Sequence, residues 1–412
     1  MTRAFPALAA VLTATALSAA ALQAPARSAM LPAAEGTREC TPGLAQYVAQ
    51  PPDAFAQMGI EAAWEFSDGE VVVAVVDSGV AASNAHLGSA VLPGLDLVER
   101  GDGRTDVFGH GTAIAGQIAA RPVSGSGLVG VAPKSKILPV RTYVDMQDQS
   151  MKAGKGPDPR RTAEGIKWAA EQGAKVIVVA QSTTQDTPAL RDAVRLATAH
   201  GALVVASAGN ASENDDGASI RFPAGYPEAL SVTAVGRDGL PSQAVVHGLH
   251  VEVAAPGQAV LTTFLDSGDC VLAGEQASTS YATGYAAGVA ALVAAAHPQE
   301  APADWEYRML ATALRSSRSQ REKNLGWGLL APREAINFVN DGRLQGPHNP
   351  RFPAPAKQVA PLLPQPVPQD PPPVDPFLVV AGMAGCSAAL TLAGVLASRL
   401  IRCGRTRSAQ DG

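Results

Sequence analysis

The stretch that decides the fold reads Val-Val-Val-Ala-Val-Val-Asp-Ser-Gly and occupies residues 71–79. A short, continuous apolar run that ends in a glycine turn is typical of a strand buried on both faces of a sheet. Similar runs follow at residues 136–140, 176–179, 202–206 and 230–235. Segments with helical spacing lie between them, at 162–172 and 187–200. This alternation predicts an α/β fold with a parallel central sheet and helices on both faces.

Two polar residues occupy positions where such a sheet carries its chemistry. Asp77 directly follows the first strand, at the carboxyl edge where functional groups gather. Taken alone, an Asp-Ser-Gly segment more often forms an ordinary turn. His110 has a glycine on each side, so its ring can face a cleft at the start of a packed helix. Both are therefore candidates whose roles depend on the rest of the site.

Ser280 and Asn210 complete a set that could perform nucleophilic catalysis. Ser280 opens a small-residue helix, where free N–H groups and the helix dipole favour a developing anion. Ser and Thr at such a place are also ordinary N-caps. Asn210 ends a strand, and its amide can point into the same cleft or satisfy its own turn. A serine nucleophile needs a base, an acid that orients the base, and oxyanion donors.

The two ends of the chain have the composition of targeting and anchoring segments. Residues 1–29 combine a basic residue near the start (Arg3), an apolar run and small residues, which predicts a secretory signal peptide; an uncut N-terminal anchor is the alternative. Residues 347–376 contain twelve prolines and predict an extended spacer. Residues 377–398 carry no charge and can cross a bilayer. Arginines follow at once and mark the cytoplasmic side, so the folded part is expected outside the cell.

The remaining composition excludes some functions. The formal net charge of -5 offers no basic patch for nucleic acid, and no cofactor or metal site is predicted. Cys40 and Cys270 are the cysteines on the exported side; they can pair in an oxidising compartment, although the sequence cannot show that they meet. Residues 143–161, rich in Gly, Lys, Asp and Gln, predict a solvated surface loop.

A family resemblance rests on four segments in chain order. They are Val75-Val-Asp77-Ser-Gly, Gly109-His110-Gly-Thr, Ala208-Gly-Asn210 and Thr279-Ser280-Tyr-Ala. These segments resemble the signature segments of subtilisin-like serine proteases, peptidase S8, and the similarity extends from about residue 54 to 335. The resemblance implies a subtilisin-like three-layer α/β fold and a serine endopeptidase that needs no cofactor.

The same resemblance implies a role for each residue. Asp77 would orient and balance His110, and His110 would act as general base and then as general acid. Ser280 would attack the scissile carbonyl, while Asn210 and the backbone N–H of Ser280 hold the oxyanion.

The substrate, a protein or peptide, would bind as an extended strand in that family's manner. It would lie beside residues 176–182 and the segment that ends at Ala208, with Ser182, Ala208 and Gly209 as contacts.

The overall layout is similar to one subgroup, the mycosins of actinobacterial type VII secretion. The segments are a signal peptide at 1–29, an N-terminal extension at 30–53, a peptidase domain at 54–340, a Pro-rich linker at 341–376, a transmembrane helix at 377–398 and a basic cytoplasmic tail at 399–412. About 25 residues between signal peptide and domain are too few for a folded prodomain. The resemblance implies a single-pass cell-membrane protein with type VII secretion membrane components as partners.

Three departures from the family pattern put full activity in doubt. Ser278 stands where the family usually has Gly, Gly284 where it has Pro, and the usual Asn is replaced within residues 179–182. A side chain at 278 would be strained if its φ had to be positive, and Gly284 is expected to loosen a helix that the family stiffens. Two hypotheses follow: a slow or narrow endopeptidase that processes exported proteins, and a structural member of a secretion complex with weak or no catalysis.

Overall fold

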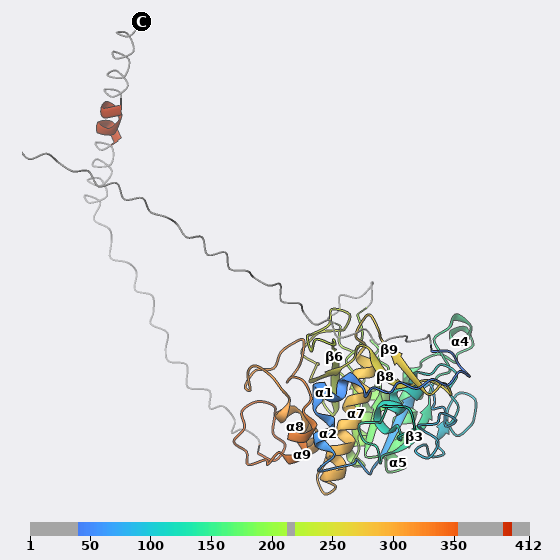
Figure 1. Ribbon diagram of the computed structural model, residues 1–412. Helices are drawn as coiled ribbons and strands as arrows, with labels where there is room; N and C mark the ends of the chain where they lie inside the picture. The colour runs from blue at the N-terminus through green and yellow to red at the C-terminus, as the bar shows by residue number, and fades with distance from the viewer. Residues whose placement is uncertain (1–39, 212–218, 353–389, 398–412) are drawn as a thin grey trace, which may run out of the picture. The chain divides into compact units, whose positions relative to one another are not determined.

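The computed structural model describes residues 40–211, 219–352 and 390–397 (Figure 1). The chain forms two units, Met1–Pro353 and Ala354–Gly412. The four signature segments all belong to the first unit. Of the second unit, residues 390–397 are described, and they are helical.

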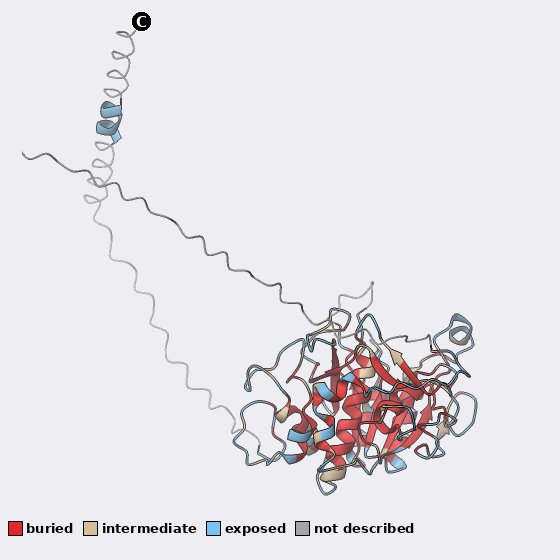
Figure 2. Ribbon diagram, viewed as in Figure 1, coloured by how far each residue is buried: buried red, intermediate tan, exposed pale blue. Residues whose placement is uncertain are grey.

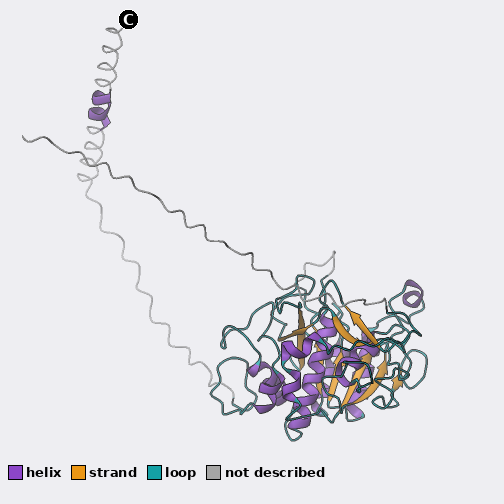
Figure 3. Cartoon of the chain, in the orientation of Figure 1, coloured by secondary structure: helices purple, strands orange, loops and turns teal. Residues whose placement is uncertain are grey.

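A seven-stranded parallel sheet forms the centre of the first unit, which confirms the predicted fold class (Figure 3). Its strand order is β2-β3-β1-β4-β5-β6-β7. The strands are β2 (Leu95–Asp96), β3 (Lys136–Arg141), β1 (Val72–Asp77), β4 (Val176–Val179), β5 (Leu203–Ser207), β6 (Ala229–Val235) and β7 (Val253–Pro256). Each predicted apolar run is one of these strands, whereas β2, which has only two residues, and β7, which ends in Pro256, were not predicted.

Helices cover both faces of this sheet, so the fold has three layers. Successive residues of a strand point to opposite faces, and Val73 and Val75 of β1 lie in one core while Ala74 and Val76 lie in the other. The first core is closed by α3 (His110–Ala119) and α7 (Thr279–Ala296), and the second by α5 (Pro159–Glu171) and α6 (Pro188–Ala199). Figure 2 shows α7 buried in the middle of the domain, as its apolar sequence requires.

Short helices and one hairpin complete the domain. The helices are α1 (Asp53–Met58), α2 (Ile60–Ala63), α4 (Asp148–Lys152), α8 (Pro302–Thr312) and α9 (Pro332–Asn337). Strands β8 (Val260–Thr263) and β9 (Asp269–Leu272) form an antiparallel hairpin. Thr262 and Thr263 donate their hydroxyl groups to carbonyl groups of α3, at 2.6 and 2.7 Å. The hairpin therefore supports the helix that begins with His110.

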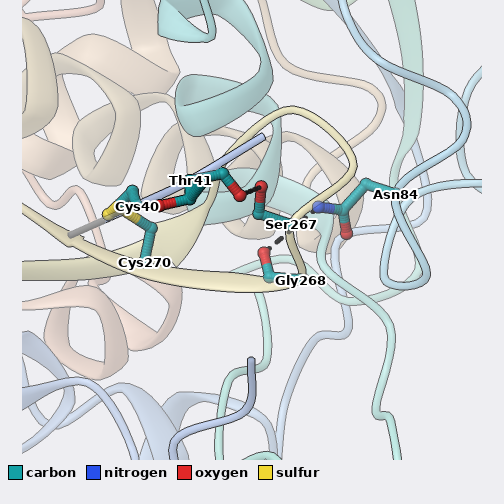
Figure 4. Close-up of a disulfide and its surroundings, with 6 residues drawn as sticks. All are labelled: Cys40, Thr41, Asn84, Ser267, Gly268 and Cys270. Atoms are coloured by element: carbon teal, nitrogen blue, oxygen red, sulfur yellow. Dashed lines mark hydrogen bonds between the residues drawn. A yellow bond between two sulfur atoms is a disulfide. The ribbon is translucent and has the colours of Figure 1, made fainter. Parts of the chain in front are cut away.

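The N-terminal extension is attached to the tip and the outer strand of this hairpin. Cys40 and Cys270 form a disulfide, and Ser267 Oγ donates to Thr41 O at 2.8 Å (Figure 4). Further along, Val48 N donates to the carboxylate of Asp269 at 2.7 Å. These bonds hold residues 40–48 against the domain.

The predicted surface loop at 143–161 is wrong in two places. Tyr143 is only 2 % exposed, because its ring turns inward toward Asp77. The last residues of the segment belong to α5, which begins earlier than predicted because Asp158 caps it and Pro159 occupies its first position. Between them, residues 148–152 form α4, which has no buried residue.

Within the parts of the chain that the structure describes, no helix has both the length and the apolar character that a bilayer crossing needs. Of the predicted span at 377–398, the structure describes 390–397. The predicted signal peptide at 1–29, most of the linker at 341–376 and the tail at 399–412 lie outside the described residues.

Candidate active site

Asp77 and His110 meet at the carboxyl edge of the sheet. Asp77 is the last residue of β1 and is fully buried, and His110 is the first residue of α3. His110 Nδ1 donates to Asp77 Oδ1 at 2.8 Å. The ring nitrogen Nε2 is thereby left as the acceptor that a general base requires.

The glycine before His110 is required by close packing. Gly109 has φ +90°, and a Cβ atom there would lie 2.3 Å from the ring of Phe264. Phe264 follows strand β8, so the hairpin contacts the chain immediately before the imidazole. A larger residue at 109 would displace either the hairpin or the start of α3.

The electrostatics of the pair are those of a carboxylate that stabilises an imidazolium. Burial raises the pKa of Asp77, but the charge and hydrogen bond of His110, with bonds from Ser78 N and Tyr143, outweigh it and lower the pKa. Burial likewise lowers the pKa of His110, but Asp77, and more weakly Asp106, raise the pKa above its ordinary value. The pair therefore favours the charged form of both partners.

Two residues of this site were missed by the sequence analysis. Tyr143 donates its hydroxyl to Asp77 Oδ1 at 2.8 Å. Asp106 is buried and accepts from Phe108 N, Gly109 N and Thr112 N at 2.9–3.0 Å, so it fixes the turn before α3. Burial raises the pKa of Asp106. The position of Tyr143 just after β3, next to β1, was the available signal for it.

Ser280 lies in the first turn of α7 and is partly buried. The next residue, Tyr281, has its ring centroid 5.9 Å from that of His110. Within residues 40–211 and 219–352, Ser280 Oγ makes no hydrogen bond. The structure thus joins Asp77 to His110 directly and brings the start of α7 beside them. In unliganded enzymes the bond from nucleophile to base is often loose.

Asn210 is tied to the same helix start instead of to its own turn. Its Oδ1 accepts from Thr279 N at 2.9 Å and from Thr279 Oγ1 at 3.0 Å. Its Nδ2 donates to Ser278 Oγ at 3.3 Å. The side-chain amide therefore lies beside Ser280, where a donor to an oxyanion is needed.

Two of the three departures from the family pattern, Ser278 and Gly284, are accommodated without strain. Ser278 has φ -123° and ψ 130°, an extended conformation open to any residue. A Cβ atom at Gly284 would lie 2.4 Å from Gln117 Oε1 of α3, and Gln117 Nε2 donates to Tyr281 O at 2.7 Å. Gln117 thus occupies the space at Gly284 and braces the helix that carries Ser280.

The predicted substrate contacts follow two neighbouring strands. Ser182 comes after β4 and lines a recess of about 160 Å³ together with Leu190 and Phe222. Ala208 and Gly209 come after β5, between that strand and Asn210. A Cβ atom at Gly209 would lie 2.5 Å from Arg221 Cγ, so the arginine stem packs against this segment.

Among the described residues, no cluster of three or more His, Cys, Asp or Glu side chains could hold a metal ion.

The fold and this site define a subtilisin-like serine endopeptidase. The chain belongs to the subtilase family, whose model matches residues 68–328. It is 35% identical to thermitase of Thermoactinomyces vulgaris over 220 residues, 53% of this chain and 75% of that protein.

Within that family the chain is related to the mycosins. It is 32% identical to mycosin-3 of Mycobacterium tuberculosis over 405 residues, 85% of this chain and 83% of that protein. The crystal structure of MycP1 with its N-terminal propeptide removed matches with a TM-score of 0.62 and 29% identity, covering 71% of this chain and 99% of that one. A chain in the structure of an intact ESX-5 inner membrane complex matches with a TM-score of 0.63 and 26% identity, covering 88% and 92%.

Proposed function

We propose that this protein is a membrane-anchored, extracytoplasmic serine endopeptidase that cleaves exported proteins in connection with type VII secretion. The hydrogen bond from His110 Nδ1 to Asp77 Oδ1, beside the start of α7, is the observation that carries the proposal. It fixes the imidazole with Nε2 available as a base. Asp77, His110 and Ser280 would cleave a peptide bond without a metal or cofactor.

The steps would be those of an Asp-His-Ser triad. Ser280 Oγ attacks the carbonyl carbon while its proton passes to His110 Nε2, and the carbonyl oxygen becomes an oxyanion. Asn210 Nδ2 and Ser280 N–H stabilise that charge. His110 then protonates the leaving amine, and an acyl-enzyme remains on Ser280. Water, deprotonated by His110, hydrolyses the ester and restores the enzyme.

The substrate would lie as an extended strand between the segments that follow β4 and β5. Ser182 on one side and Ala208 and Gly209 on the other would contact its backbone. This position brings the scissile carbonyl next to Asn210, because Asn210 follows Gly209 directly.

Anchoring is supported by the uncharged residues 377–398 with arginines after them, and by the membrane complex that contains a related chain. After cell fractionation the protein is expected in membranes, and deletion of 377–412 is expected to release it. A deleted form that stays in the membrane fraction would show that the span is wrongly assigned.

A second candidate is a structural member of a secretion complex with dispensable catalysis. Ser278 favours it, because its hydroxyl accepts the hydrogen bond of Asn210 Nδ2 that an oxyanion would need. An active-site probe separates the two. The full-length protein in membranes should be labelled by a fluorophosphonate, and Ser280→Ala should not. Absent labelling of the wild type, with membrane partners still co-purifying, would favour the structural role.

Cleavage of a peptide library by the wild type beside Ser280→Ala defines the specificity. We expect the Ser280→Ala protein to lose turnover by about 10⁴-fold or more. Equal cleavage by both proteins would contradict the assignment of Ser280.

A further inference from the structure

The phenol of Tyr143 is buried against the carboxylate of Asp77. Tyr143 lies two residues beyond Arg141, which pairs with Asp77 in the β1–β3 register. Thr142 N donates to Asp77 O at 2.8 Å, and Val144 N donates to Lys155 O at 2.8 Å. The backbone on both sides of Tyr143 is therefore fixed, and the ring of Tyr143 points toward the end of β1.

Three donors converge on one oxygen of Asp77. Oδ1 accepts from His110 Nδ1, from Ser78 N and from Tyr143 Oη, each at 2.8 Å. Within the described residues Oδ2 is buried and has no hydrogen-bond partner. Tyr143 Oη also lies 3.4 Å from His110 Nδ1, so phenol and imidazole share the same acceptor. The phenol's ring packs edge-on against Phe108, with 6.1 Å between centroids.

This arrangement limits how much of the carboxylate's charge acts on the imidazole. A donor that stabilises a carboxylate weakens the bond the same oxygen forms with a second donor. The phenol itself stays neutral, because burial and the charge of Asp77 raise the pKa of Tyr143 well above its ordinary value. Tyr143 is therefore protonated at neutral pH and acts as a donor to Asp77.

We propose that Tyr143 is a positioning residue of the catalytic pair, whose hydroxyl holds Asp77 Oδ1 in place and shares its negative charge with His110. The expected effect of Tyr143 on turnover rests on the proposed function. The expected effect of Tyr143 on proton binding by His110 does not, because proton binding is measurable in a protein without activity.

The groups that face His110 determine the direction of the effect. Asp77 from β1 and Asp106 from the turn before α3 both stabilise the imidazolium, while Tyr143 competes with it for Asp77. Tyr281 from α7 contributes a neutral ring, because burial and the charge of Asp77 raise its pKa to about 12. Removal of the Tyr143 hydroxyl leaves Asp77 free to hold the imidazolium more tightly, so the pKa of His110 should rise.

Tyr143→Phe in the full chain tests the proposal. We expect the acid limb of the kcat/KM profile to move to higher pH by about 0.5–1 unit. On the alkaline side of this limb, kcat should fall by about 3- to 10-fold with KM unchanged, because the carboxylate loses a support. A purely structural role would lower the amount of folded enzyme and leave the limb in place.

Tyr226→Phe is the matched control. Tyr226 is 3 % exposed and donates its hydroxyl to Asp186 Oδ1 at 2.9 Å, so the change removes the same kind of bond away from His110. The acid limb of this variant should coincide with that of the wild type. An equal shift in both variants would overturn the proposal.

Replacement of Tyr143 by 3-fluorotyrosine keeps the ring and strengthens the donor. The acid limb should then move in the opposite direction, to lower pH, which no loss of folding can imitate. If Tyr143→Phe fails to fold, this replacement alone decides the question, and an unchanged limb would refute the proposal.

Proton binding by His110 can also be followed by NMR of its ring in Ser280→Ala. If the wild type hydrolyses no peptide, the proposed function fails. A shift of the His110 titration in Tyr143→Phe on the Ser280→Ala background would still support the role of Tyr143, and an unshifted titration would overturn it.

Discussion

The two halves of the candidate active site are held in different ways. Asp77 is fully buried and bonded by three donors through one oxygen, so the side that carries the base is rigid. On the other side Ser280 Oγ has no hydrogen bond within the described ranges, and exposed Asn210 contacts Ser278 at 3.3 Å. The difference indicates that the proposed base, His110, is preorganised, while the proposed nucleophile, Ser280, has room to adjust to a substrate.

After Ser280→Ala, the largest effect on turnover is expected at Asn210, on the side of the proposed nucleophile. Asn210→Ala should lower kcat by about 100- to 1,000-fold with little change in KM, because the lost donor acts on the oxyanion. Peptide hydrolysis before substrate depletion measures both constants. An increase in KM with an unchanged kcat would indicate that Asn210 binds the substrate in its ground state instead.

A change on the rigid side should act on folding. Gly109→Ala places a methyl group against the ring of Phe264, and the backbone of residue 109 has φ +90°. Gly125 has a similar φ of +87° with no atom within 4 Å of a Cβ, so Gly125→Ala measures the backbone cost alone. We expect Gly125→Ala to lower the free energy of unfolding by about 1 kcal/mol, and Gly109→Ala by about 1–3 kcal/mol more.

Denaturant unfolding of the two variants beside the wild type gives the comparison. If both variants lose the same free energy of unfolding, the tip of the hairpin moves easily and does not hold the start of α3.

The pH dependence tests the charge around the base. Because the pKa of His110 is raised, the imidazole becomes neutral only above its ordinary 6.5, and the acid limb of kcat/KM should lie above that pH. Asp106→Asn removes a charge that raises this pKa, so the limb should move down by about half a unit. Asp102→Asn, an exposed carboxylate in the same loop, should leave it unchanged.

The linked effect on stability has a definite sign. A raised His pKa stabilises the folded state fully below 6.5, and this contribution is lost as pH rises through the folded value. The lowered pKa of Asp77 contributes above its ordinary 3.8 and is lost as pH falls through the folded value. Urea unfolding at several pH values should therefore show the contribution of the pair decreasing toward both extremes.

The smallest effect is expected at Ser278. Its backbone is unstrained, so Ser278→Gly relieves no strain, and the 3.3 Å bond that it removes from Asn210 is long; kcat should change by less than about threefold. Steady-state hydrolysis decides this. A larger gain in kcat would show that the Ser278 hydroxyl competes with the oxyanion for Asn210.

Five of the seven strands in the sheet and the four signature segments could be predicted because each depends on local sequence. An apolar run such as 71–76 predicts a buried strand, and a polar residue after it lies at the sheet edge. Tyr143 was not predicted, because it lies in a polar segment and is buried through the register of β3 against β1. The contact of Gly109 with Phe264 joins residues 155 positions apart, which no local pattern reveals.

The clearest partial prediction concerns Ser278 and Gly284. The sequence indicated that both depart from the family pattern, and strain or looseness followed as expectations. The extended φ of Ser278 and the side chain of Gln117 over Gly284 remove those expectations. Both depend on long-range packing, which decides whether a substitution is costly.

The covalent bond between Cys40 and Cys270 has a consequence for any processing of the chain. A single cut between these two positions leaves both fragments joined, so the nicked protein keeps its mass. Maturation or self-digestion in that interval would be invisible on a non-reducing gel and would appear as two bands once a thiol reductant is added.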